Sequence, residues 1–433
     1  MSPLLIGALG LAALFGLIVL HVPIGIAMII VGIGGYALQT GWAPALTLLA
    51  SEPSGLLASV DLATVPLFLL MGTFATAAGF SRDIYSAAAA VMGHRRGGLG
   101  YATIGGCATF GAVCGSSTAT AATFAKAALP EMLRRGYAPS FSAGTIAAGG
   151  AMKSLIPPSI VMILYAIVAQ AFIFDLFIAA LVPAVLAIAL NLLAVAVVVR
   201  LDPGVAPLAA RVAMAERWAA VRAAAPALAL LASVFAGIYS GVFTVNEAAS
   251  VAAVLSLVFA FARGRLDRAS LWQGLRDTAA ATAMIYVIII GASLFSYYMT
   301  LARVPEALMS AIGGLDVPPL AIIFALLAAY LVLGAVFDEI AAMLITLPFV
   351  LPVVQGLGYD VVWWGIINVV VIELGMITPP IGIIVFVLHG LAPQISLPAI
   401  YRGVVPFIVA DLVLLVLLTL FPAIALWLPS LLK

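Results

Sequence analysis

Hydroxyl side chains gather beside a glycine in the first half of the chain. Gly115-Ser116-Ser117-Thr118 places three hydroxyls inside an apolar stretch. A helix broken here would expose backbone carbonyls next to the hydroxyls, and such oxygens bind a cation such as sodium. The N-terminus of the helix that follows the break would favour a carboxylate. We therefore expect Gly115, Ser116 and Thr118 to hold a cation and Ser116 and Ser117 to contact a substrate. The alternative is that these small residues only let two helices pack closely.

A proline pair is the second candidate. Pro157-Pro158 follows Gly150 and precedes Ser159. Proline lacks an amide proton and clashes with the preceding turn, so two in succession break a helix and leave carbonyls without partners. This predicts cation contacts at Gly150 and Pro157 and a substrate contact at Ser159. A simple kink is the alternative.

A similar break begins at Glu373 in the second half. Gly375, Thr378 and Pro379, the first residue of another proline pair, would offer a hydroxyl and carbonyl oxygens to a cation. Glu373 lies deep in an apolar segment, where an ionisable residue is costly and points to function. It could stabilise the unwound backbone, bind the cation or carry a proton.

Two further charged positions lie at membrane depth. Lys153 stands four residues before Pro157, and it could face a substrate carboxylate, pair with an acid or extend to the nearby interface. Asp338 and Glu339 are adjacent acids inside an apolar stretch. They mark a site unless this stretch reaches water, and we place Asp338 among the cation ligands.

The chain repeats these landmarks. Pro130, Gly136-Tyr137 and Pro157-Pro158 return 222 residues later. Gly111-Ala112-Val113 returns as Gly334-Ala335-Val336, with one residue of slippage. We expect two halves, 1–200 and 224–433, joined by a basic cytoplasmic linker over 201–223.

The elements that position these residues are apolar spans. Each half is expected to contain five spans, and because five is an odd number, the second half would enter the membrane inverted. Paired interrupted segments in inverted repeats are typical of secondary transporters. The interrupted stretches 98–129 and 318–351 predict one re-entrant hairpin in each half. The ten expected spans are 3–20, 22–40, 57–80, 140–173, 177–199, 224–241, 246–262, 278–300, 362–390 and 404–428.

Composition agrees with an all-α integral membrane protein. Of the 433 residues, 65% are apolar and 8% are charged, and the mean hydropathy is +1.28. No soluble globule could bury that much apolar surface, which excludes a cytosolic enzyme, a nucleic-acid binder and a disordered chain. Two cysteines are too few for a disulfide framework, and three scattered histidines disfavour a zinc site. The first span has no signal-peptide features, so we expect it to be retained.

Lys and Arg set the expected orientation. With the N-terminus outside, fifteen of the 18 basic residues fall on the cytoplasmic side, as the positive-inside rule requires. The first hairpin would then open to the cytoplasm and the second to the outside. No nucleotide-binding Gly-Lys loop is present, so ATP does not drive transport on this chain.

The motifs resemble those of the large membrane subunit of TRAP transporters, the tripartite ATP-independent periplasmic transporters. The resemblance covers nearly the whole chain. The matching stretches are Val22-Pro23-Ile24-Gly25, Gly115 to Thr120, Pro130-Glu131-Met132 with Gly136-Tyr137, Leu155 to Ser159 and Glu373 to Gly382.

The resemblance implies an elevator-type transporter, in which a domain carrying both hairpins slides against a scaffold. It implies sodium as the coupling ion and a small organic acid as substrate, such as a C4-dicarboxylate or sialic acid. The partners would be a periplasmic binding protein and a small four-helix membrane subunit, in the bacterial inner membrane. Lys153 stands where the resemblance implies a small residue, which bears on the substrate contacts more than on the ion sites.

Three other functions remain open from the residues alone. A carrier of the same architecture could work without a binding protein, for example on citrate or a dicarboxylate. Paired helix breaks can also line a channel, although opposed hairpins suit alternating access better. An intramembrane enzyme is disfavoured, because no metal motif or nucleophile–base pair shows at usable spacing.

Overall fold

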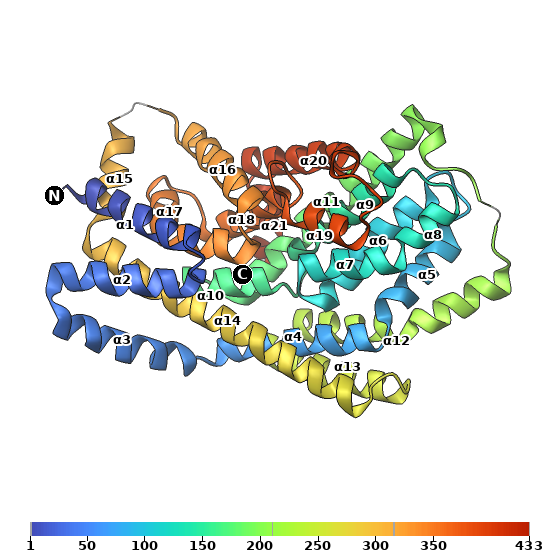
Figure 1. Cartoon of the computed structure of the whole chain (residues 1–433), viewed down its shortest axis with the longest axis horizontal. Helices are drawn as coiled ribbons and strands as arrows, with labels where there is room; N and C mark the ends of the chain where they lie inside the picture. The colour runs from blue at the N-terminus through green and yellow to red at the C-terminus, as the bar shows by residue number, and fades with distance from the viewer. Residues whose placement is uncertain (1, 210, 315–316, 433) are drawn as a thin grey trace.

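The computed structural model describes residues 2–209, 211–314 and 317–432, and this part of the chain is helical without any strand. Figure 1 shows its course. Up to Leu201 the helices are α1 (Pro3–Val19), α2 (Ile24–Thr40), α3 (Trp42–Leu57), α4 (Val60–Ala77), α5 (Phe80–Met92), α6 (Gly98–Cys114), α7 (Ser117–Ala127), α8 (Leu129–Arg134), α9 (Pro139–Ala151), η1 (Met152–Leu155), α10 (Ile160–Ala169) and α11 (Ile173–Leu201).

A short 3₁₀ turn, η2 (Pro203–Val205), leads to the second set of helices. They are α12 (Met214–Tyr239), α13 (Val245–Ala262), α14 (Arg268–Leu301), α15 (Val304–Gly313), α16 (Pro319–Val336), α17 (Glu339–Gly356), α18 (Val361–Gly375), α19 (Ile383–Leu391), α20 (Leu397–Leu420) and α21 (Ala423–Leu432).

The helices are long and apolar on the outside, which confirms the all-α membrane class. In the described residues, nine helices are long and apolar enough to cross a bilayer when the broken helix over 139–169 is counted as one. Large apolar side chains such as Leu38 and Leu201 are more than 80% exposed on the surface of the chain. A soluble protein avoids large contiguous apolar surfaces, whereas a bilayer covers them.

Several helices differ from the predicted spans, and α12, for example, begins at Met214, ten residues before the predicted start at 224 and inside the predicted linker. Two other helices show the reason. α3 lies almost wholly between the predicted spans 22–40 and 57–80, carries Glu52 and Pro53 in its second half, and buries only Ala45. α14 begins ten residues before the predicted start at 278, because Asp267 caps it by accepting a hydrogen bond from the Ser270 amide. The hydropathy pattern missed both features because their polar residues lie within or before the apolar window.

Each predicted hairpin stretch is a pair of helices. α6 and α7 meet at Gly115, which adopts the left-handed conformation (φ 74°) that glycine allows. α16 and α17 meet at Phe337 and Asp338. The second pair continues to Gly356, past the predicted end at 351, because Pro348 and Pro352 lie inside α17 without ending it.

Each proline pair interrupts a helix, as predicted. The first break separates α9 and η1 from α10, and residues 152–159 are all buried. The second separates α18 from α19, and there Pro379 and Pro380 are exposed. The two breaks therefore have unlike surroundings although their sequences correspond.

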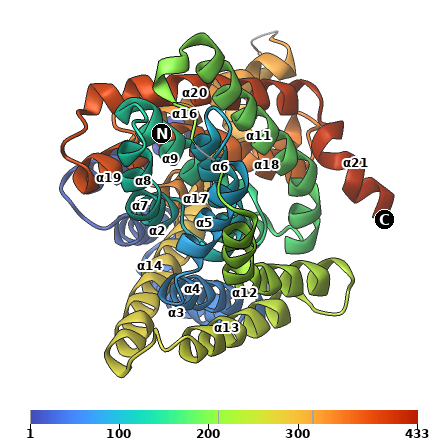
Figure 2. The ribbon, with the colours of Figure 1, turned by 90° about the vertical axis from the view of Figure 1, so that its right-hand side faces the viewer.

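The helices pack in reciprocal pairs. α7 lies against α19 and α17 against α10, so each hairpin contacts the segment after the other half's break. In the same way α2 packs on α14 and α4 on α13. Figures 1 and 2 show α3, α4, α13 and α14 as a layer along one side, with the hairpins and broken helices above it.

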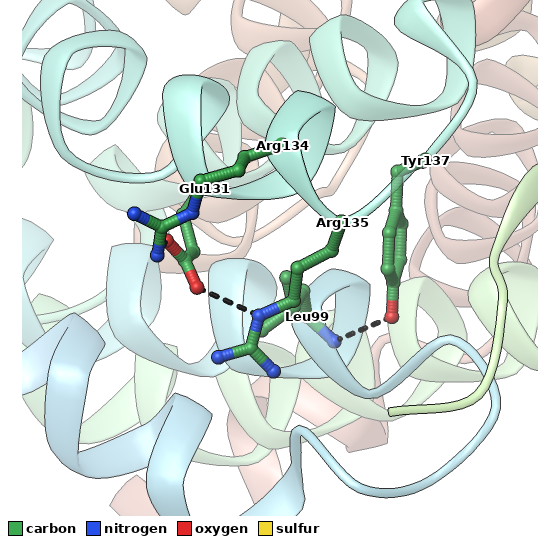
Figure 3. A network of polar contacts seen from close by, with 5 residues as sticks. All are labelled: Leu99, Glu131, Arg134, Arg135 and Tyr137. Carbon is green, nitrogen blue, oxygen red and sulfur yellow. Dashed lines mark hydrogen bonds and ion pairs between the residues drawn. The ribbon is translucent and has the colours of Figure 1, made fainter. Parts of the chain in front are cut away.

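Polar contacts close the base of the first hairpin (Figure 3). The Leu99 amide, at the start of α6, donates to the Tyr137 hydroxyl at 3.2 Å. Glu131 of α8 pairs with Arg134 and Arg135 one turn later. The repeated tyrosine of the second half, Tyr359, stacks on Trp363 instead, with ring centroids 4.7 Å apart.

Candidate functional site

The two hairpins meet at a buried cluster of oxygens. The Ser117 hydroxyl, at the start of α7, donates to Glu339 Oε2 at 3.0 Å. The Ser154 hydroxyl, in the first helix break, lies 2.8 Å from the same Oε2 and 2.9 Å from the Ser117 hydroxyl. All three side chains are buried. Both hairpins and the first break thus converge on one carboxylate oxygen.

Two more charged groups adjoin this cluster through Ser154. The Ser154 amide donates to Glu373 Oε1, so the second half's α18 reaches the first half's break. Lys153 is fully buried, and its ammonium lies 3.4 Å from the Ser154 hydroxyl. A buried charge is tolerated only near compensating charges and hydrogen bonds. The two carboxylates and the ammonium therefore share one site.

Glycines let the backbones approach closely around the cluster. A Cβ on Gly111 of α6 would lie 2.6 Å from Lys153 Cγ, so this glycine makes room for the lysine stem. A Cβ on Gly375 would lie 2.5 Å from the carbonyl carbon of Gly334, so α16 and α18 touch backbone to backbone. The Gly382 amide donates to the Ala335 carbonyl at 3.0 Å, which ties the second break to its own hairpin.

The predicted ligands at the first hairpin tip lie close together. The Ser116 hydroxyl caps α7 by accepting from the Ala119 amide at 3.3 Å, and it lies 3.1 Å from the Thr118 hydroxyl. Gly115 joins the two helices next to Ile160 of α10. These residues lie beside Ser117 in the chain, but within the described residues neither Ser116 nor Thr118 is hydrogen-bonded to Glu339.

The predicted residues at the two helix breaks mostly cap helices or pack against neighbouring helices. Ser159 caps α10 by accepting from the Met162 amide at 3.4 Å and is buried. Gly150 packs on α7, because a Cβ there would lie 2.7 Å from Ala121 Cβ. Pro157 is buried, whereas Pro379 is exposed.

The second half's predicted ligands differ in burial. Asp338 is exposed and caps α17 by accepting from the Ile340 amide at 3.0 Å. The Thr378 hydroxyl donates to the Leu374 carbonyl at 2.6 Å, and Glu373 is buried. Of the adjacent acids, Glu339 and not Asp338 thus points into the cluster.

A second polar pair lies deeper among the long helices. Asn191 of α11 donates to Asp411 Oδ1 of α20 at 2.8 Å, and both side chains are buried. Asp411 and Glu373 border the same small cavity. The described residues contain no group of three His, Cys, Asp or Glu side chains placed to hold a metal ion.

Comparison with known proteins decides the family. The sequence model of the family described as tripartite ATP-independent periplasmic transporter, DctM component, matches residues 11–424. The chain belongs to this family. It is 34% identical over 372 residues to a C4-dicarboxylate TRAP transporter large permease protein of Pseudomonas aeruginosa, covering 85% of this chain and 86% of the relative.

Further relatives show how far the resemblance extends. This DctM-component chain is 30% identical over 421 residues to an ectoine TRAP transporter large permease protein of Halomonas elongata, covering 97% and 98% of the two chains. It shares its fold with the solved YdaH transporter of Alcanivorax borkumensis, at a TM-score of 0.61, 15% identity and 89% coverage of each chain. The DctM-component chain is a TRAP transporter large permease subunit and a multi-pass membrane protein.

Two central residues of this DctM-component site were absent from the predicted set. Ser154, which follows Lys153 in the chain, is not among the predicted ligands, and of the two adjacent acids the prediction chose Asp338 and not Glu339. A signal for Glu339 was available, since it stands 222 residues after Ser117, the same offset as the repeated landmarks. Asn191 and Asp411 gave no signal, because each stands among apolar neighbours in the middle of a long apolar helix.

Proposed function

We propose that this chain is the permease subunit of a sodium-coupled importer of a small organic acid. The observation that carries the proposal is the contact of Ser117 and Ser154 with Glu339, where both hairpins and a broken helix meet. Secondary transporters place substrate and coupling-ion sites at such interfaces between repeats, near the bilayer midplane.

The chemistry of the donors fits sodium. The atoms of the cluster that can bind a cation are all oxygens, from two hydroxyls and two carboxylates, and the helix breaks add carbonyls. Hard monovalent and divalent cations favour such oxygens, whereas transition metals favour nitrogen and sulfur. Two buried carboxylates beside one ammonium leave one negative charge, which one monovalent cation would neutralise. The proposed ion ligands are Gly115, Ser116, Thr118, Gly150, Pro157, Asp338, Glu373, Gly375, Thr378 and Pro379, to which the geometry adds Ser154 and Glu339.

The substrate class rests on the relatives. Their names specify C4-dicarboxylate and ectoine, which both carry carboxylates. We propose that an organic acid binds at the N-terminus of α7, through Ser116 and Ser117, with Ser159 and Lys153 on the side of the first break. The free amides and positive dipole of a helix N-terminus favour a carboxylate.

The movement is proposed to be of the elevator type. The halves 1–200 and 224–433 would be inverted repeats, and the reciprocal packing of α7 with α19 and of α17 with α10 supports this. The hairpins and broken helices would slide as a unit along the layer that contains α4, α13 and α14. The N-terminus would be periplasmic and the membrane the bacterial inner membrane, because this orientation places most basic residues in the cytoplasm.

The proposed partners follow from the three-part character of the family. A periplasmic binding protein would deliver the acid, and a small four-helix membrane subunit would complete the permease.

Reconstitution in liposomes tests the proposal. Uptake of succinate, the probe acid, should require an inward sodium gradient, the binding protein and the small subunit. Ser116→Ala, Asp338→Ala and Thr378→Ala should each impair uptake while leaving membrane insertion unchanged. Uptake that ignores sodium would refute the coupling, and uptake by this chain alone would favour a carrier that needs no binding protein. Single-channel currents would favour a channel.

A further inference from the structure

A crevice of about 400 Å³ opens away from the central cluster. It lies between the α4–α5 turn, the C-terminal part of α7 and the turn before α14. Lys126 in its wall is ten residues beyond Ser116, which corresponds to about 15 Å along a helix. The crevice is therefore separate from the hairpin tip.

Its charged lining is entirely basic. Arg82 of α5, Lys126 of α7 and Arg265 before α14 border it, and no acidic residue does. Within the described chain none of the three forms an ion pair, and the neighbouring Asp83 is occupied by Arg263. Arg265 donates to the Ala78 carbonyl at 3.0 Å, but none of the three cations has an acidic partner in the part of the chain that the structure describes. Like charges around one volume repel each other, and a bound anion would relieve this repulsion.

A helix N-terminus points to the same ligand. α5 begins after Gly79, which is left-handed (φ 76°) and lines the crevice, and no side chain caps this end. The first backbone acceptor of α5 is used by the Asp83 amide, so the amides of its first three residues have no helical partner. Such amides, together with the helix dipole, bind anions.

A buried hydroxyl supplies an independent observation. Ser81, in the first turn of α5, is 6% exposed and lines the crevice. Among the described residues its hydroxyl has no hydrogen-bond partner, since no contact of this group is found while the other buried serines are paired. A hydroxyl without a protein partner is left to water or to a ligand, so an anion in the crevice would supply its hydrogen bond.

We propose that Ser81, Arg82, Lys126 and Arg265 form an anion site for a carboxylate or phosphate group. The proposed occupant is the transported organic acid after it leaves the hairpin tip, and this role rests on the proposed function and orientation, which put the crevice on the cytoplasmic side. Thr123, one turn before Lys126 on α7, also lines the crevice, on the side of the hairpin tip along the sequence. A phospholipid headgroup offers the same chemistry from a second source.

Equilibrium binding to the full-length chain tests the site without transport. In phosphatidylcholine nanodiscs at low salt, radiolabelled inorganic phosphate should bind once per chain and be displaced by succinate. Arg82→Gln and Lys126→Gln should each weaken binding about ten-fold, and Ser81→Ala a few-fold, because each removes one contact. Arg95→Gln, an exposed arginine outside the crevice, is the matched control and should bind like the wild type.

The possible results test the existence of the anion site and the identity of its occupant separately, and neither depends on a transport assay. Absence of saturable binding, or equal binding by all variants, overturns the anion site, provided that gel filtration shows each variant folded. In nanodiscs that contain phosphatidylglycerol, retained phosphate binding supports a soluble anion. The opposite result would be that phosphate no longer binds in these nanodiscs, while the wild type retains anionic lipid and Arg82→Gln does not. That result would overturn the role in substrate exit and assign the site to a lipid headgroup. Sodium-driven uptake is measured separately, so a failure of coupling does not affect this result.

Discussion

Ser117 donates a hydrogen bond to Glu339 at 3.0 Å across 222 residues of sequence. The offset equals that of the repeated prolines and of the Gly-Tyr pair, so the contact joins positions that correspond in the two proposed repeats. Corresponding residues touch when they lie close to the axis that relates two repeats. The proposed transport site therefore lies where the two halves meet.

The charge of Glu339 should be essential for transport. Glu339→Gln keeps the shape and one acceptor oxygen but removes the charge that the Ser117 and Ser154 hydroxyls face. Since hydrogen bonds to charged groups contribute about 1.5–3 kcal/mol, we expect sodium-dependent uptake to fall at least about ten-fold. Glu306→Gln, an exposed acid in the first turn of α15, is the control. Equal uptake by both variants would contradict the central role of Glu339.

The Lys153 ammonium should stabilise the fold through the cluster. Lys153→Met leaves Glu339 and Glu373 without the buried cation that adjoins them through Ser154. Uncovering buried charge costs about 3 kcal/mol, so the variant should melt at a lower temperature in detergent, and sodium chloride should restore part of the loss where choline chloride does not. An unchanged melting temperature in both salts would exclude this role.

The contact between α16 and α18 should tolerate no side chain. Gly375→Ala would place a Cβ 2.5 Å from the Gly334 backbone, and backbone cannot move aside as a flexible side chain can. We expect destabilisation of about 3 kcal/mol and loss of uptake. Gly34→Ala in α2, where a Cβ meets nothing within 4 Å, should change neither property. Measurement of thermal stability for both variants decides the matter.

Inverted repeats predict opposite sidedness for corresponding loops. Arg134→Cys, after the first hairpin, and Gln355→Cys, at the end of the second, introduce thiols at exposed positions, whereas the native Cys107 and Cys114 are buried. An impermeant thiol reagent added to intact cells should label Gln355→Cys, and it should label Arg134→Cys only in inverted vesicles. Labelling of both from the same side would remove the inversion and with it the elevator proposal.

Local sequence predicted the breaks well because their causes are local. A proline pair ends a helix whatever surrounds it, and Gly115 allows a left-handed turn, so both helix breaks and both helix pairs lie where the sequence places them. The end of the second hairpin was misjudged at Pro352, since a helix tolerates proline when neighbouring helices satisfy the freed carbonyl.

The partners of the buried polar residues could not be predicted in this way. Asp338 and Glu339 are indistinguishable by composition, but the helix start at Glu339 turns one carboxylate outward as a cap and the other inward to Ser117. Asn191 and Asp411 meet only because α11 and α20 cross.

By itself the sequence determined the membrane class, the interrupted helices and the doubled landmarks, because hydropathy, proline and glycine act within a few residues. The tertiary structure decided which oxygens converge, that Lys153 lies fully buried beside Ser154, and that three basic residues from separate segments border one crevice. Those facts depend on side-chain direction and on packing between distant helices, and no local pattern encodes them.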